Sequence, residues 1–574
     1  MLGSLAKRLR KSFMSHIQGY DRYDILVALA ILSYGIIFSY FTILKHYTFN
    51  SFAADLGMFD QAFYTTIFHG KLFYYTPELW INPTGYYFGV HFSPILFTLL
   101  PVYAIYPSPE SLLVAQSFLL AIAALPLYLL SKTLLKSKKA SFALVVAYLL
   151  FTPLHGANWF DFHPQAFIPL LIFSLYYFFI KKSWKLYLAT VIIALMIQEH
   201  LPYILFVVAL CNIFAIHSKS MINFCKSLKK FGNIQLKGLK TRFTSSIKNL
   251  FQMNQTSVSV LTIVLSAGWY LLTNYVKSFY PITPEFLDIY RAVGAFEVLG
   301  FTEDILLLPV YMALNPQRIF EALMFDFHIK FIYMILLFGP LLFLSFKSKF
   351  FVVILFILVP ELVTNNRAYY TVGAQYPLYL IPFIFIAAVE GLSNIFAHNQ
   401  NSHGFSLRFQ KESLERLIPT IIVVSMIFTI FTTPLSPFSS EFSERGIFWY
   451  PEPFYMKHDK GQVESLHAMM DLIPSDSSIL TQNNLFPHVS SRVNAYMIPF
   501  DLSAFHEDGK KGYMLNYTRQ FIRDSEYILL NTRLTDYWTI FVFEEALSGQ
   551  FGVRASTYSY VLFERNYEGL PSFS

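Results

Sequence analysis

Cysteine and charged residues are both scarce in this sequence. Only Cys211 and Cys225 occur among 574 residues, so a disulfide framework is not expected. Charged residues make up 14% of the chain against 55% hydrophobic residues, and the mean hydropathy is +0.46, which excludes an ordinary soluble globular domain. The net charge of +7 is modest and in such an apolar chain mainly reflects loop placement, so it does not indicate a nucleic-acid partner.

Long apolar stretches recur along the first three quarters of the chain and predict a multispanning α-helical membrane protein. A helix needs about 20 residues to cross the bilayer core. If every cluster of Lys and Arg is cytoplasmic, the chain crosses the membrane about eleven times, with the N-terminus inside and the C-terminus outside. This solution requires residues 93–106 to lie in the interface, and it requires residues 186–217 to break near Pro202.

The predicted organisation of the chain in the cell membrane has three parts. Residues 1–22 form a basic cytoplasmic N-terminus, residues 23–433 form the membrane domain, and residues 434–574 form a domain outside the cytoplasm. Within the membrane domain, outer loops are expected at about 45–110, 155–165, 277–330 and 364–375.

The C-terminal part has a pattern of its own, because hydropathy falls after about residue 434. Short strands are predicted in "SSILT", "NAYMI" and "EYILLN", helices around 512–524 and 536–548, and closing strands in "GVRAS" and "SYVLFER". This order predicts a small α/β domain with a mostly parallel sheet that ends in a hairpin. No phosphate-binding glycine-rich loop follows the first strand, so no nucleotide site is expected.

Titratable residues outside the Lys-rich loops converge on the predicted outer face. Ionisable residues near the apolar boundary are costly unless they line a wet cavity or a site, so their convergence favours a functional site. The residues are Asp55, Asp60 and His91 of the first outer loop, Asp161 and His163 of "HGANWFDFHPQ", Glu199 and His200 of "QEH", and Arg367 of "TNNRAYYTVGAQY".

Several separated motifs resemble one family. "DLGMFDQAFYTTIFHGKLFYYT", "FHPQAF", "QEH", "AQYPLYLIPFIFIAAVEGL" and "IPSDSSILTQNNLFPHVSSR" are similar to the predicted membrane protein family called domain of unknown function 2079, over about residues 22–566. That family in turn resembles the GT-C glycosyltransferases, which have an acidic residue in the first outer loop and use polyprenyl-phosphate sugars at the outer face. One departure is that the family's Lys-Glu-Asp is Gln198, Glu199 and His200 here.

The resemblance implies a catalytic base in the first outer loop. Sugar transfer from a lipid phosphate needs a group that takes the acceptor's proton, and Asp55 is the predicted base with Asp60 as its alternative. The sequence also allows Asp55 to be a helix N-cap and Asp60 to be an ordinary polar-face residue. A helix that begins near residue 55 carries an apolar stripe suited to lying on the membrane interface, formed by Leu56, Phe59, Phe63 and Ile67.

Other residues are predicted to contact the phosphate or the sugar. A guanidinium pairs well with phosphate, although a loop arginine can equally meet lipid head groups, and an interfacial histidine can simply bind backbone. A carboxylate at a helix break needs either a site or a buried partner, and the sequence does not separate the two. The predicted contacts are His91, His163, Glu199, His200, Arg367 and Gln61.

No cofactor is required by the sequence, but a divalent metal is an alternative. Asp161 and His163, two residues apart, could ligate manganese or zinc together with Asp55, because carboxylate and imidazole suit these ions. The spacing is not specific for a metal, and several branches of the GT-C superfamily work without one.

The sequence therefore predicts a GT-C-like glycosyltransferase. Its expected partners are a polyprenyl-phosphate-linked sugar, membrane lipids, and an acceptor at the outer surface that is a glycan, a lipid or a protein. A transporter or lipid flippase is the chief rival, because intramembrane acids and a broken helix also suit alternating access. The absence of an internal repeat counts against this rival. A third alternative is a non-enzymatic envelope protein that presents the C-terminal domain.

Overall fold

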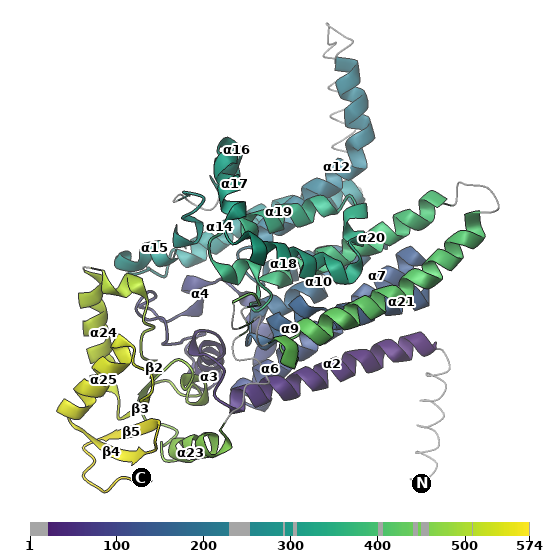
Figure 1. Cartoon of the computed structure of the whole chain (residues 1–574). Helices are drawn as coiled ribbons and strands as arrows, with labels where there is room; N and C mark the ends of the chain where they lie inside the picture. Colours follow the sequence, from purple (N-terminus) through teal and green to yellow (C-terminus); the bar gives the residue numbers. More distant parts are fainter. Residues whose placement is uncertain are drawn as a thin grey trace, which may run out of the picture.

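The computed structural model of the chain has a bundle of apolar helices with a smaller α/β domain at one end (Figure 1). It describes residues 21–228, 253–290, 293–301, 307–399, 406–439, 443, 446–448, 450, 459–507 and 509–572. The basic N-terminus predicted for residues 1–22 lies almost entirely outside the described residues.

The helices of the bundle follow one another in the order that the apolar stretches predict. They are α2 (Arg22–Tyr47), α6 (Pro109–Ile122), α7 (Ala124–Leu135), α8 (Lys138–Leu149), α9 (Thr152–Trp159), α10 (Phe167–Ile180), α11 (Trp184–Leu195), α12 (Leu201–Leu228), α14 (Gln255–Lys277), α18 (Phe327–Phe338), α19 (Phe351–Leu362), α20 (Ile381–Asn399) and α21 (Ser406–Thr432).

Shorter elements connect these helices. They include the π-helical turn η1 (Ala53–Gly57), α3 (Met58–His69), α4 (Tyr87–Val90), η2 (Pro94–Leu99), α5 (Leu100–Ile105), η3 (Pro164–Ala166), η4 (Pro284–Phe286), α15 (Leu287–Tyr290), α16 (Leu308–Leu314), α17 (Pro316–Met324), η9 (Arg367–Tyr370) and η10 (Tyr376–Tyr379).

Membrane-spanning helices are partly recognisable by length and composition. Within the described ranges, three helices are long and apolar enough to cross a membrane, namely α2, Pro109–Leu135 and α14. The count rises to 5 if each of two bent pairs crosses as one span, and seven shorter apolar helices remain. The chain thus has several apolar helices, while the number of eleven crossings and the interfacial position of residues 93–106 stay predictions.

Prolines mark two interruptions of the bundle. The predicted break of residues 186–217 is confirmed, because α11 ends at Leu195 and α12 begins at Leu201 with Pro202 in its first turn. Proline is tolerated there because the first turn has no partner for its N–H. Pro153 has the same place in α9, which follows α8 at an angle of 41°.

The first outer loop is more deeply buried than the sequence suggested. The stripe of Leu56, Phe59 and Phe63 is at most 1% exposed and packs into the main hydrophobic core. A stripe that rests on the membrane would be turned toward lipid, so the prediction that this stripe lies on the membrane is wrong, while the position of α3 at the outer interface stays a prediction. Other protein elements cover α3 instead.

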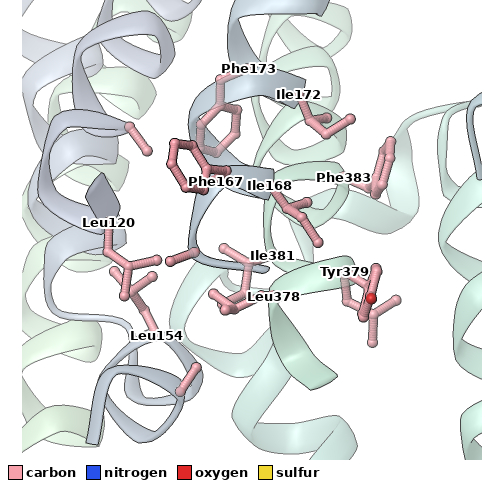
Figure 2. Close-up of a cluster of buried hydrophobic side chains, with 14 of the residues drawn as sticks. Leu120, Leu154, Phe167, Ile168, Ile172, Phe173, Leu378, Tyr379, Ile381 and Phe383 are labelled. Carbon is pink, nitrogen blue, oxygen red and sulfur yellow. The ribbon is translucent and has the colours of Figure 1, made fainter. Parts of the chain in front are cut away.

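A buried apolar core fixes the start of α10, which is joined to His163 by the short turn η3. In Figure 2, side chains of α10 lie between those of α6 and α9 on one side and those of η10 and α20 on the other. The labelled residues are Leu120, Leu154, Phe167, Ile168, Ile172, Phe173, Leu378, Tyr379, Ile381 and Phe383. Close packing of this kind leaves the loop that precedes α10 little freedom to move.

Gly156 allows α9 to lie against the segment that follows η9. A Cβ built on Gly156 would lie 1.8 Å from the carbonyl oxygen of Val372, so one of the two segments would have to move. We expect Gly156→Ala to lower the free energy of unfolding by about 1–3 kcal/mol or more, as measured by unfolding in detergent. Gly268 of α14, whose Cβ would meet nothing within 4 Å, is the control. Equal destabilisation by Gly268→Ala would contradict this account.

The C-terminal domain is built on a five-stranded sheet. The strands are β1 (Ile479–Thr481), β2 (Ala495–Met497), β3 (Tyr527–Asn531), β4 (Phe551–Ser556) and β5 (Tyr560–Arg565), in the order β2-β1-β3-β5-β4. The pairs of β1 with β2 and β3 are parallel, whereas β5 pairs antiparallel with both β3 and β4. The domain's helices are α23 (Lys460–Met470), α24 (Lys510–Asp524) and α25 (Tyr537–Ser548), and the turn η12 (Phe486–His488) follows β1.

Candidate functional site

Asp55 lies on η1, the π-helical turn between α2 and α3. The backbone N–H of Phe52 donates to Asp161 Oδ2 at 3.0 Å, and that of Ala53 donates to the carbonyl oxygen and Oδ1 of Asn483 at 2.8 and 2.9 Å. The chain therefore enters this turn with its first two amides already paired, one with the bundle and one with the C-terminal domain. Such π-turns are rare and often occur at functional sites.

The Asp55 carboxylate is held on one side only. Its Oδ1 lies 2.8 Å from His163 Nε2, and the two side chains are 19% and 6% exposed. The other ring nitrogen of His163 lies 3.3 Å from the carbonyl oxygen of Asp161, and Phe160 stacks on the ring at 5.3 Å. Asp55 Oδ2 has no hydrogen-bond partner in the part of the chain that the structure describes. The carboxylate is thus oriented by His163 while one oxygen stays open to another molecule.

A buried ion pair between Lys45 and Asp161 supports this arrangement. Lys45 Nζ lies 2.8 Å from Asp161 Oδ1, both side chains are 1% exposed, and the ammonium also donates to the carbonyl oxygen of Trp159 at 2.8 Å. Burial raises the pKa of Asp161 to about 6, while the ammonium of Lys45 opposes this rise. The backbone of Asp161 is left-handed, with φ of 102°, a conformation that aspartate tolerates better than most residues. Asp161 is therefore a structural partner of η1.

The metal hypothesis finds no support in this geometry. Both oxygens of Asp161 are engaged, by Lys45 and by the amide of Phe52, and Asp55 and His163 bind each other. Among the residues that the structure describes, no group of three or more His, Cys, Asp or Glu is arranged to hold a metal ion. We assign no metal ligands.

A second polar cluster is centred on Glu199, in the break between α11 and α12. Glu199 Oε1 lies 2.9 Å from His91 Nδ1 and 3.3 Å from Lys277 Nζ, and Oε2 accepts from the amide of Phe92 at 3.3 Å. Lys277, the last residue of α14, also donates to the carbonyl oxygen of Val90 at 2.8 Å. Three segments far apart in the sequence therefore meet at one carboxylate.

The charge of Glu199 is stabilised by its neighbours. Burial favours the neutral acid, but His91, Lys277 and His200 outweigh it and hold the pKa of Glu199 well below its ordinary value. Burial lowers the pKa of His200, whose ring lies 6.0 Å from that of Tyr379. Glu199 is therefore the anionic member of this cluster.

Neutral side chains complete the second cluster. Gln198 Oε1 accepts hydrogen bonds from Gln165 Nε2 at 2.6 Å and from the Tyr379 hydroxyl at 2.8 Å, and its amide nitrogen lies 3.1 Å from His91 Nδ1. The remaining ring nitrogen of His91, Nε2, has no partner among the described residues, and the side chain is 38% exposed. His91 therefore offers one free polar atom next to an anchored ring.

Glu78 links the two clusters electrostatically. His91 lowers the pKa of Glu78 and Asp55 raises it, although burial is the largest influence and raises it. The hydroxyl of Tyr75 donates to Glu78 Oε2 at 2.7 Å. The two clusters are also neighbours in space, because the Phe59 ring lies 6.3 Å from the ring of His163 and 5.1 Å from that of Tyr87. The Tyr87 ring in turn lies 5.9 Å from that of His91.

Asp60 lies elsewhere, at a buried interface between α3 and the C-terminal domain. It is 0% exposed, its Oδ1 accepts from the Tyr103 hydroxyl at 2.5 Å, and its Oδ2 accepts from the hydroxyls of Ser490 and Ser491 at 2.6 and 2.8 Å. A buried carboxylate with three donors is satisfied by the protein itself. The prediction of Asp60 as an alternative base finds no support in this environment.

Gln61 lies at the same interface. Its amide nitrogen donates to three backbone carbonyls of residues 492–495, including that of Ala495 at 3.2 Å, and its Oε1 accepts from the amide and hydroxyl of Thr76. The predicted contact with substrate finds no support either, because both ends of the buried Gln61 side chain are used within the protein. Asp60 and Gln61 attach α3 to the C-terminal domain.

Asp60 makes the stability of this interface depend on pH. Burial raises its pKa from 3.8 to about 6, so the folded protein binds the proton more tightly than the unfolded chain. We expect its contribution to be fully present below about pH 4 and lost as the pH rises through about 6, with an upper limit of about 3 kcal/mol. Melting temperatures of the wild type and Asp60→Asn between pH 4.5 and 7.5 test this. A difference between the two proteins that does not change with pH would contradict it.

Arg367 is committed to a neighbouring acid. Its Nε and Nη2 donate to the two oxygens of Asp326 at 2.8 and 3.2 Å, and the Tyr370 hydroxyl donates to the same carboxylate at 3.1 Å. No hydrogen bond or ion pair joins Arg367 to Asp55, His163 or His91 within the described structure. Its predicted contact with phosphate stays untested.

Several members of the two clusters were missed by sequence reasoning. A signal existed for two of them: Lys45 and Lys277 are single basic residues at the predicted outer ends of apolar stretches, where the positive-inside rule does not expect them. Glu78 sits in a loop rich in aromatic residues and offered no such signal. Tyr379 was hidden in an apolar run.

Comparisons with known proteins agree with the membrane assignment. Residues 45–565 match the model of a family described as "Predicted membrane protein (DUF2079)". No curated protein matches the chain. Among solved structures, one that is similar is the crystal structure of ArnT from Cupriavidus metallidurans in the apo state, with 10% sequence identity and a TM-score of 0.43, covering 92% of this chain and 97% of that one. At this TM-score the similarity has no bearing on the site.

Proposed function

The chain belongs to the DUF2079 family of predicted membrane proteins, and on this premise we propose that it is a membrane glycosyltransferase. Family membership and the long apolar helices identify an integral membrane protein. In the proposed reaction, a polyprenyl-phosphate-linked sugar enters from the bilayer, and an acceptor at the outer membrane face receives the sugar. The N-terminus is then cytoplasmic and the C-terminal domain lies outside.

The observation that carries this proposal is the half-free carboxylate of Asp55. His163 holds Oδ1 at 2.8 Å, and Oδ2 is free to accept a proton from an acceptor hydroxyl. As the proton moves to Asp55, the acceptor oxygen forms a bond to C1 of the sugar. The bond between C1 and the phosphate oxygen breaks, and the polyprenyl phosphate leaves with the electron pair.

The cluster around Glu199 is suited to the phosphate end of the donor. The departing phosphate gains negative charge, which cationic and N–H donors stabilise. Lys277 supplies an ammonium and His91 a free ring nitrogen, while Glu199 holds both side chains in place. Because a series of ring contacts leads from His163 through Phe59 and Tyr87 to His91, the base and the phosphate donors lie near each other.

Purified protein reconstituted in liposomes tests the proposal. The probes are synthetic polyprenyl-phosphate hexoses and pentoses, with an envelope fraction as the source of acceptor. Release of polyprenyl phosphate together with labelled sugar on the acceptor supports a transferase. Movement of a fluorescent polyprenyl-phosphate sugar between leaflets, without any new glycan product, would favour a flippase and overturn the proposal.

A further inference from the structure

We propose that the C-terminal domain is part of the catalytic unit, because residues after strand β1 set the position of the Asp55 turn. This inference rests on the proposed function of Asp55. Two residues of the C-terminal domain carry it: Asn483 binds the start of η1, and Phe486 packs against its end. Both act on Asp55 through the backbone of η1, at Ala53 and Gly57, so both are positioning residues.

The start of η1 is tied to Asn483. The amide of Ala53 donates to both the carbonyl oxygen and the side-chain Oδ1 of Asn483, at 2.8 and 2.9 Å. Ala53 is 0% exposed, so water cannot replace these hydrogen bonds unless η1 and the C-terminal domain separate. The first amide of the turn thus depends on a residue 430 positions later in the chain.

The end of η1 rests on Phe486. A Cβ built on Gly57 would lie 2.6 Å from Cδ1 and 3.1 Å from Cε1 of Phe486, so the backbone of the turn lies directly against the aromatic ring. Phe486 and Leu56 are both 0% exposed. A glycine at this position allows the contact, and any larger residue must displace either the ring or the turn.

Further contacts keep η12 and the loop after it in place. Asp60 binds Ser490 and Ser491, and the rings of His46 and His488 stack at 4.1 Å with an angle of 6°. The Asp55 carboxylate lies between the two anchor points of η1, at residues 53 and 57. A shift of η12 therefore changes the position of Asp55 relative to His163, and misplacement of about 1 Å can cost about 10²-fold in rate.

A steric rescue experiment tests this link in the full-length protein. Gly57→Ala is expected to lower kcat at least about tenfold, while KM for the lipid-linked sugar stays within about twofold. Phe486→Val removes the two ring atoms that the new methyl group would meet, so the double variant is expected to regain most of the lost kcat. Gly512→Ala in α24, where a Cβ meets nothing within 4 Å, is the matched control.

Hydrogen exchange of residues 52–58 provides a readout that does not need activity. We expect faster exchange in Gly57→Ala and a return toward the wild-type rate in the double variant. If no sugar donor is turned over by the wild type, the proposed function fails, but the exchange measurement still decides whether η12 positions the turn. The inference is overturned if Gly57→Ala leaves exchange and kcat unchanged, or if Phe486→Val does not relieve its effect.

Discussion

Asp55→Asn is expected to lower kcat for sugar transfer by about 10²–10⁴-fold, the usual contribution of a general base. Asparagine keeps the shape of the side chain and can still bind His163, but it cannot take the proton of the acceptor hydroxyl. KM for the lipid-linked sugar should change little, because Asp55 does not contact the phosphate in our proposal. Initial rates in reconstituted liposomes, at several donor concentrations, measure both parameters.

The control for this variant is another carboxylate outside the bundle. Asp288 of α15 pairs with Lys510 at 3.0 Å and takes no part in either cluster. Asp288→Asn should leave kcat within about twofold of the wild type, since surface ion pairs of this kind contribute little. Full transfer activity in Asp55→Asn would rule out Asp55 as the base.

Lys45→Met is expected to have the largest effect on stability, a loss of about 3–5 kcal/mol in the free energy of unfolding. The substitution removes the ammonium but leaves the carboxylate of Asp161 buried at 1% exposure without its charged partner. Unfolding in detergent, followed by tryptophan fluorescence, measures the loss. Lys460→Met, at an exposed position at the start of α23, should change the free energy of unfolding by less than about 0.5 kcal/mol.

A double variant separates the buried charge from lost packing. In Lys45→Met with Asp161→Asn, no uncompensated charge remains, and the asparagine oxygen can still accept from the amide of Phe52. We therefore expect the double variant to recover at least half of the lost stability. Equal instability of the single and double variants would show that packing around Lys45, and not the ion pair, is decisive.

The sequence predicted those features that depend on local patterns. The break at "QEH" follows from a proline in an apolar run too long for one helix, and it is found at residues 196–200. The convergence of polar residues on one side also followed from the distribution of Lys and Arg. It brought Asp55 and His163 together in the prediction, and in the structure they are 2.8 Å apart.

Pairings over long sequence distances could not be predicted in the same way. Asp55 and Asp60 look alike in the sequence, because both are carboxylates in an otherwise apolar and aromatic run. What separates them is the neighbour that covers each residue: Ser490 and Ser491 bury Asp60, whereas Asp55 keeps one open oxygen. Those serines belong to another domain, and nothing in "FAADLGMFDQAF" indicates where that domain packs.

The bond between Ala53 and Asn483 also sets an order of events during synthesis. The two residues are 430 positions apart, so at about 5–20 residues per second the ribosome adds Asn483 about 20–90 s after Ala53. All bundle helices from α6 to α21 are made in this interval. The turn with Asp55 must therefore wait for its last support, and a nascent chain that stops before β1 has every bundle helix but an unfinished site.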